Sequence, residues 1–369
     1  MPTLWGTTYD RNELLRRVGR LDQIAGVRLV TLGDGVERGV RVLEFCTGSG
    51  FSFDVLVDRA FDIGRCEHNG RALGWQSAVG FTGPWFYEAE GFGFLRSFGG
   101  GLLTTCGLDH TLFATEDSAA QYHYPPKPTE SYGLHGRISN RPARLVGYGE
   151  RWDGDECVLW AAGEVVQASA LGETLLLRRR IESYVGASHL TIRDEVINSG
   201  FHPTPHMLLY HVNVGFPIVD AGAEIVLPAL GATACGEYPM EGFTTLQPPT
   251  PDYEEQVFEY DPLAEADGSV PIGIVNRARG FGMYEVFKRD QLPHPFIWRM
   301  LGEGNYAVAL EPSTNRVAGR HDARARGELI QLAPGETRRY DLELGALDGS
   351  TAIDQFVARM AALREAAHR

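Results

Sequence analysis

The sequence predicts an all-β protein, and three observations support this fold class. Glycine is in excess, at 44 of the 369 residues, which is about 12% against an average near 7%. Together with the 20 Pro residues, these glycines favour many short elements joined by turns. Strand-like runs also follow one another with very short turns between them, and this leaves no room for the crossover helices of a parallel sheet.

Alternation of apolar and polar residues defines the individual strands. Residues 51–58 alternate with period 2 directly after a Thr-Gly-Ser-Gly turn, and this pattern predicts a hairpin. In the run 188–198, Leu190, Ile192 and Val196 would face one side of the sheet while the residues between them face the other. The remaining strands are expected at residues 158–161, 164–170, 174–185, 272–275 and 282–287.

Helices are expected only at the two ends of the chain. Residues 10–17 contain helix-forming residues behind Asp10, a residue type that caps helices well. Near the C-terminus, apolar residues recur at the spacing of an amphipathic helix that would pack on the sheets or on a second copy of the chain in a homodimer. These residues are Ile353, Phe356, Val357, Met360 and Leu363. The Pro- and acid-rich stretch 247–268 is predicted to be a surface loop.

Charge and composition argue against several classes of protein. The chain has 34 Lys and Arg against 48 Asp and Glu, a net charge of −14, and nucleic-acid binding needs clustered cations instead. The densest basic run, residues 178–180, lies inside an expected strand. No apolar stretch reaches the roughly 18–20 residues of a membrane span, and the N-terminus lacks the pattern of a signal peptide. Five scattered Cys do not form a disulfide framework, so we expect a cytoplasmic protein.

The motifs of nucleotide and metal binding are not evident. The glycine run at residues 98–102 lacks the spacing of a dinucleotide loop, and no Gly-Lys-Ser/Thr follows a glycine-rich turn. His202, His206 and His211 lie within ten residues, but two prolines exclude a helix there and an extended chain turns His206 and His211 to opposite sides. Cys106 is expected to be a small buried residue. We therefore expect neither a metal nor a cofactor.

Four segments combine ionisable or polar side chains with an apolar strand context. They are residues 94–102, 132–137, 207–213 and 308–315. In the last two segments an ionisable residue directly follows a hydrophobic run, so it should be partly removed from water. Burial moves the pKa values of His and Glu toward the neutral range, where acid and base catalysis is efficient.

These segments resemble the aldose 1-epimerase, or galactose mutarotase-like, family in both content and order. A Leu-His-Gly element comes first at 134–136, and a strand that ends in Asn-x-Gly follows at 198–200. A Pro-containing strand then leads to His211, and a Leu-Glu-Pro element follows at 310–312. The Asp-Arg-x-x-Asp-Ile-Gly run that begins at Asp58 looks more narrowly like a divergent subfamily, most of whose members have no assigned substrate.

The resemblance implies a large antiparallel β-sandwich with a cleft on the concave face of one sheet. It also implies a cofactor-free exchange of the α and β anomers of a free sugar, with Glu311 as the base, His211 as the acid and His135 near the ring oxygen. Because the matching elements must converge on one cleft, we expect a single domain over residues 1–369. The N-terminal helical segment would occupy residues 1–20 and the C-terminal helix residues 350–369.

The residues expected to bind the sugar are less firmly matched to the family. They are Arg96, Arg137, Asn213 and Trp298. Arg137 stands where the family has a second Gly, and it would favour an anionic sugar such as a uronate, sulfonate or phosphate through a charge-assisted pair. No residue matches the substrate-binding Asp of the family.

Other interpretations of the same residues stay open. Arg96 and Arg137 would equally serve in structural ion pairs, and Trp298 in a core strand. Arg59 and Asp62 look like an internal salt bridge. At the level of function, the alternatives are a lyase or keto–enol isomerase that acts on a uronate or keto sugar, and a non-catalytic carbohydrate-binding module.

Overall fold

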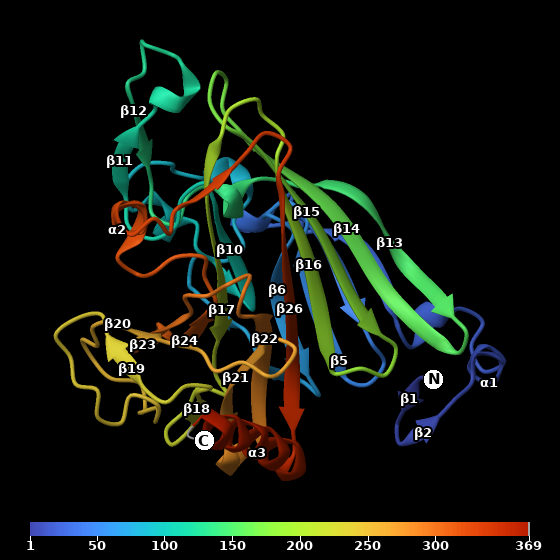
Figure 1. The fold of residues 1–369 in the computed structure, drawn as a ribbon. Coiled ribbons are helices and arrows are strands. Elements are labelled where there is room, and N and C mark those ends of the chain that lie inside the picture. The colour runs from blue at the N-terminus through green and yellow to red at the C-terminus, as the bar shows by residue number, and fades with distance from the viewer. Residues whose placement is uncertain (368–369) are drawn as a thin grey trace.

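The protein is built from two large antiparallel sheets that face each other (Figure 1), as the computed structural model shows for residues 1–367. The larger sheet has twelve strands. In order across this sheet they are β19 (Ala232–Ala234), β20 (Gln256–Tyr260), β23 (Phe296–Leu301), β24 (Tyr306–Glu311), β17 (Thr204–Val214), β10 (Leu103–Leu108), β6 (Asp62–His68), β5 (Phe51–Leu56), β4 (Arg41–Cys46) and β3 (Gly26–Thr31), with β7 (Arg71–Ala72) beside β6 and β25 (Ile330–Leu332) beside β17.

The second sheet has eight strands. In order they are β13 (Arg144–Asp153), β14 (Glu156–Ala168), β15 (Thr174–Tyr184), β16 (His189–Asn198), β26 (Thr337–Asp348), β22 (Phe281–Lys288), β21 (Ser269–Asn276) and β18 (Glu224–Val226). Three two-stranded ribbons complete the β structure: β1 (Thr3–Leu4) with β2 (Thr7–Thr8), β8 (Trp75–Gln76) with β9 (Gly100–Gly101), and β11 (Thr115–Ser118) with β12 (Thr129–Tyr132).

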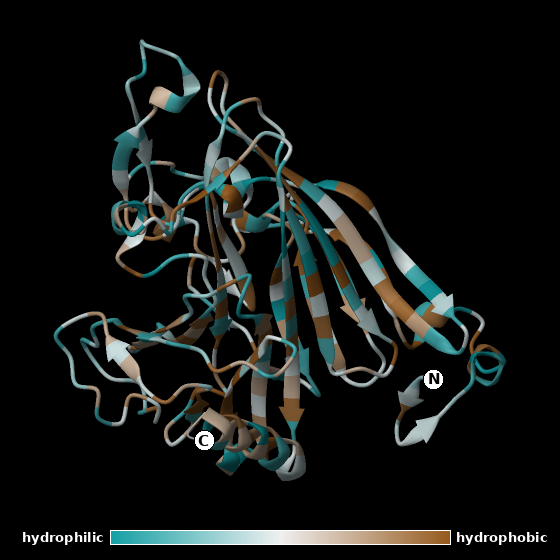
Figure 2. Ribbon diagram, viewed as in Figure 1, coloured by the Kyte–Doolittle hydropathy of each residue, from teal (hydrophilic) through white to brown (hydrophobic). Residues whose placement is uncertain are grey.

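The two sheets bury one hydrophobic core between them. Their strands alternate along their length between apolar and polar side chains (Figure 2), as expected when one face of a sheet is covered. Val55 and Val212 of the larger sheet and Ile192 and Leu342 of the smaller sheet all belong to this core. The predicted β-sandwich is therefore confirmed.

Most strand predictions are confirmed, with two corrections. The hairpin before residue 58 forms as β4 and β5, and the expected runs 158–161 and 164–170 are one continuous strand, β14. The stretch 247–268 is wrongly predicted as a loop throughout, because it contains β20. That strand pairs with β23 in the larger sheet, so its few residues are stabilised by a partner far along the chain.

The helices lie mainly at the two termini, as predicted. Helix α1 (Arg11–Leu15) begins after Asp10, whose side chain accepts a hydrogen bond from the backbone of Glu13. Helix α3 (Ser350–Ala367) lies across the outer face of the smaller sheet (Figure 1), where Ile353, Phe356 and Met360 are buried. Residues 368–369 of the predicted helix lie outside the described residues. A further short helix, α2 (Gly319–Ala325), was not expected from the sequence.

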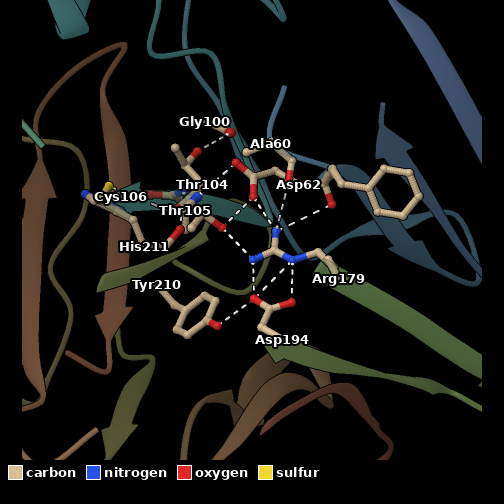
Figure 3. A network of polar contacts seen from close by, with 12 residues as sticks. Ala60, Asp62, Gly100, Thr104, Thr105, Cys106, Arg179, Asp194, Tyr210 and His211 are labelled. Atoms are coloured by element: carbon tan, nitrogen blue, oxygen red, sulfur yellow. Dashed lines mark hydrogen bonds and ion pairs between the residues drawn. The ribbon is translucent and has the colours of Figure 1, made fainter. Parts of the chain in front are cut away.

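A fully buried ionic network connects the two sheets (Figure 3). Arg179 on β15 donates to Asp194 on the neighbouring β16 at 2.6 Å and to Asp62 on β6 of the opposite sheet at 2.7 Å. Asp62 also accepts hydrogen bonds from the backbone and the hydroxyl of Thr105 on β10. Tyr210 on β17 donates its hydroxyl to Asp194 at 2.6 Å. The network therefore fixes the spacing of the two sheets through side chains from five strands.

The network corrects the expectation for Arg59 and Asp62. Asp62 forms its ion pair with Arg179 of the opposite sheet, whereas Arg59 donates to the backbone oxygens of Thr82 and Ser97. Sequence proximity suggested a local salt bridge, but the fold supplies a partner from the opposite sheet.

We predict that Arg179→Met lowers the free energy of unfolding by about 3–5 kcal/mol, because it leaves two buried carboxylates without a cation. Urea denaturation monitored by circular dichroism measures this change. Arg178→Met is the matched control, since the Arg178 side chain is 52% exposed and its pair with Glu164 lies at the surface; it should cost less than about 1 kcal/mol. Equal effects of the two substitutions would contradict the structural role of the network.

Candidate active site

Strand register brings His211 and Glu311 together on the outer face of the larger sheet. Val212 pairs with Leu310 across β17 and β24, so the preceding residue on β17 lies beside the following residue on β24. The Nε2 atom of His211 lies 3.5 Å from Oε1 of Glu311. Both side chains are nearly buried, at 4% and 3% exposure. Their burial and separation suit proton transfer to and from one small ligand.

The pair lies at the bottom of a cleft of about 130 Å³. The floor of the cleft is a separate apolar cluster that includes Phe94, Phe98 and Phe296. The complete lining is Phe92, Phe94, Leu95, Phe98, Leu112, Phe113, Leu134, His135, His211, Glu255, Val257, Phe296, Trp298, Glu311 and Val317. Seven separate stretches of the chain therefore meet in this cleft.

The Leu-His-Gly element forms a tight turn that presents His135 to this cleft. His135 and Gly136 both have left-handed backbones, with φ of 58° and 70°. A Cβ atom on Gly136 would lie only 2.5 Å from the carbonyl oxygen of Gly107, so only glycine fits there. The turn places the His135 ring 5.7 Å from the His211 ring, centroid to centroid and edge-on.

Removal from water determines the protonation of the site. Burial lowers the pKa of His211 to about 4 and lowers the pKa of His135 well below its usual value. Burial, with a smaller contribution from Glu255, raises the pKa of Glu311 well above that of an ordinary carboxyl group. Because desolvation disfavours every charged form, burial favours a neutral imidazole on His211 and a protonated carboxyl group on Glu311.

Trp298 and Asn213 lie next to the pair in different ways. Trp298 lines the cleft beside Val257 of β20, with its ring 5.6 Å from that of His211. Asn213 is fully buried and is not part of the cleft lining. Its amide donates to the backbone oxygen of His211 at 3.0 Å, so its visible role is to support the strand that carries the histidine.

The structure does not bring Arg96 and Arg137 to the cleft. Arg96 forms an exposed ion pair with Glu88. Arg137 is paired with the buried Glu173 and lines a separate small pocket on the other side of the Leu-His-Gly turn. The four sequence segments therefore converge, but the basic side chains within them point elsewhere.

Sequence reasoning missed Glu255 and the aromatic floor. Glu255 immediately precedes β20, and its Oε2 atom accepts a hydrogen bond from the indole nitrogen of Trp298 at 2.8 Å. The strand-like run Gln-Val-Phe-Glu-Tyr at 256–260 was the signal that could have placed it. Phe94 and Phe98 were inside a selected segment, but nothing in their local pattern indicated which way they face.

Other features of the structure are less suited to chemistry. The two larger hollows, of about 660 and 680 Å³, lie away from the histidine–glutamate pair, and the first is lined by surface ion pairs such as that of Arg65 with Asp54. His206 faces the core, opposite to His211, and lies 2.7 Å from both the Leu108 carbonyl and the Tyr340 hydroxyl.

Among residues 1–367, no group of three or more His, Cys, Asp or Glu residues could hold a metal ion. No helix in that range is long and apolar enough to cross a membrane.

Solved structures with this fold include proteins described as aldose 1-epimerases and galactose mutarotase-like proteins. A candidate aldose 1-epimerase from Klebsiella pneumoniae matches with a TM-score of 0.82 and 24% identity over 93% of this chain and 90% of its own. A galactose mutarotase-like protein from Clostridium acetobutylicum matches with a TM-score of 0.60 and 12% identity over 87% and 98%. Galactose 1-epimerase from Lactobacillus acidophilus matches with a TM-score of 0.54 and 11% identity over 88% and 99%.

The fold of the chain is therefore a galactose mutarotase-like sandwich. The sequence profile of the DUF4432 family, described as a domain of unknown function, matches residues 37–346, and the chain belongs to this family. No curated protein matches the sequence. The predicted resemblance to a divergent mutarotase-like group is confirmed.

We predict that acid destabilises the fold partly through His206, whose pKa is lowered to about 4 by burial. Unfolding restores a pKa near 6.5, so the unfolded chain binds more protons below that pH. The free energy of unfolding should therefore fall between about pH 6.5 and 4, by up to about 3 kcal/mol from this residue. Denaturant titrations across this range should show a shallower pH slope for His206→Gln than for the wild type.

Buried carboxyl groups change the free energy of unfolding with pH in the opposite direction to His206. Burial raises the pKa values of Glu285 and Glu311, so their contribution to stability decreases as the pH rises above about 4.5. The comparison of slopes isolates His206 because both proteins retain these carboxyl groups. An unchanged slope in His206→Gln would contradict the prediction.

Proposed function

We propose that the protein is a mutarotase, which interconverts the α and β anomers of a free sugar by opening and closing its ring. The observation that carries this proposal is the nearly buried pair of His211 and Glu311, 3.5 Å apart at the bottom of a cleft. The coarser inference, a carbohydrate-related protein, is supported by the fold of its structural neighbours.

The reaction needs one group that accepts a proton and one that donates it. Glu311 takes the proton of the anomeric hydroxyl while His211 gives a proton to the ring oxygen, and the bond between C1 and the ring oxygen breaks. Rotation about the C1–C2 bond then turns the other face of the aldehyde to the ring hydroxyl. The two groups return their protons as the ring closes, so no proton is gained or lost. The chemistry requires no cofactor.

The pair carries the single proton that this cycle needs. Burial favours the uncharged form of both side chains, with the proton on Glu311. Proton transfer over the 3.5 Å between them yields the carboxylate and the imidazolium that start the cycle. Because the two groups exchange roles when the ring closes, either arrangement supports anomer exchange.

The neighbouring side chains are suited to orient the sugar. His135 approaches His211 edge-on and would hydrogen bond near the ring oxygen. Trp298 offers an apolar surface for a sugar face. Glu255, held by the Trp298 indole, would accept hydrogen bonds from sugar hydroxyls.

We predict that Glu311→Gln lowers the rate of anomer exchange by about 10²- to 10⁴-fold, because the amide cannot accept the anomeric proton. Saturation-transfer NMR measures the exchange directly, after subtraction of the uncatalysed rate. Glu254→Gln is the matched control, since Glu254 is exposed and does not line the cleft. Wild-type exchange in a folded Glu311→Gln protein would refute the proposal and favour a binding module.

We also predict a bell-shaped dependence of kcat/KM on pH. Below about pH 4, His211 becomes protonated as well, the pair holds two protons, and no base remains. Above the raised pKa of Glu311, the pair loses its only proton and no acid remains. The two limbs belong to the pair as a whole. In the Glu311→Gln variant, the pH profile of the residual kcat/KM should lose its decrease at alkaline pH. If that decrease persists, another group is responsible for it.

A further inference from the structure

The wall of the cleft is largely apolar. Apart from two histidines and two glutamates, every side chain that lines the cleft is aromatic or aliphatic. Three of these apolar side chains are more than half exposed to solvent and so lie at the mouth of the cleft: Phe92 at 57%, Leu95 at 51% and Phe113 at 56%. Exposed apolar groups that gather at a cleft usually mark a surface that a ligand covers.

Among the described residues, the cleft lining offers no Lys or Arg side chain to an anionic ligand. Within residues 1–367, the cleft lining contains two carboxyl groups, Glu255 and Glu311, and no Lys or Arg. The nearest basic candidates from the sequence, Arg96 and Arg137, are held in ion pairs with Glu88 and Glu173 outside it. An anionic substituent would therefore lose its water without gaining a Lys or Arg partner.

The aromatic floor lies beside the two histidines that would face the ring oxygen of a sugar. If His211 serves the ring oxygen, the carbon bonded to that oxygen, C5, lies beside it, and so does the substituent that C5 carries. The Phe98 ring lies 5.1 Å from the His211 ring, and the Phe94 ring lies 5.0 Å from the His135 ring. The two phenylalanines stack on each other at 5.0 Å. In this orientation of the sugar, the group on C5 would contact the aromatic carbon atoms of Phe94 and Phe98.

We propose that the substrate is a neutral 6-deoxy sugar, an aldose whose C5 carries a methyl group in place of a hydroxymethyl or a carboxylate. The proposal rests on the proposed mutarotase function. A methyl group loses nothing when it leaves water for the Phe94 and Phe98 surface, whereas a hydroxyl gains no hydrogen bond from the carbon atoms of these two rings.

Two series of sugars that differ only at C5 test the proposal. The first is D-xylose, 6-deoxy-D-glucose, D-glucose and D-glucuronate, and the second is L-arabinose, 6-deoxy-D-galactose, D-galactose and D-galacturonate. Saturation-transfer NMR measures the exchange rate of each, and quenching of tryptophan fluorescence measures binding separately. We expect the 6-deoxy member to exceed the hydroxymethyl member roughly 10- to 100-fold in kcat/KM, and the uronate to be the poorest.

Two substitutions test whether the preference for 6-deoxy sugars arises at Phe98. Phe98→Tyr keeps the ring and adds a hydroxyl on the cleft floor, so it should narrow the ratio between the 6-deoxy sugar and its hydroxymethyl counterpart by roughly tenfold. Phe201→Tyr makes the same change at a side chain that is 91% exposed and outside the cleft, so it should leave the ratio unchanged. Equal ratios in both variants and the wild type would contradict the placement of C5.

The outcomes separate this inference from the proposed function. Faster exchange of the hydroxymethyl sugar or the uronate overturns the substrate class and leaves the mutarotase function intact. Preferential binding of the 6-deoxy sugars without any exchange supports the ligand class and overturns the mutarotase function. Neither binding nor exchange with any member of the two series overturns both.

Discussion

The buried ion pairs of Arg179 are the interaction on which the rest of the structure depends. A guanidinium group with no exposure to water needs anionic partners on more than one side, and it finds Asp194 on its own sheet and Asp62 on the other. The same carboxylates hold Thr105 and Tyr210. Because Tyr210 immediately precedes His211, the network in the core also fixes the strand that carries the proposed acid.

Strand β17 shows how one extended segment serves both the core and the cleft. Alternate residues point to opposite faces, so Tyr210 and His206 face the core while His211 faces the cleft. The side chains on the core face form hydrogen bonds with Asp194 and Tyr340. On the opposite face, His211 lines the cleft. The rigidity of one face therefore preorganises the other, which is what a proton-transfer pair requires.

The site could be predicted only in part from the sequence. His135, His211 and Glu311 lie in short elements whose order resembles a known family, and the structure gathers all three in one cleft. Arg96 lies in an equally suggestive segment, but its side chain turns outward to Glu88, which no local pattern indicates. Glu255 was hidden in a Pro- and acid-rich stretch because the short strand after it forms only against a distant partner, β23.

The sequence by itself determined the strand alternation, the tight Gly-containing turns and the helix at each end, because these depend on neighbours a few residues apart. Only the tertiary structure decided which side chains share a space, because that depends on register between strands that are far apart in the chain. It paired Asp62 with Arg179 and not with Arg59, and it placed phenylalanines rather than arginines around the histidines. The chemistry of the pair follows from the sequence pattern, whereas the character of the cleft around it follows from the fold.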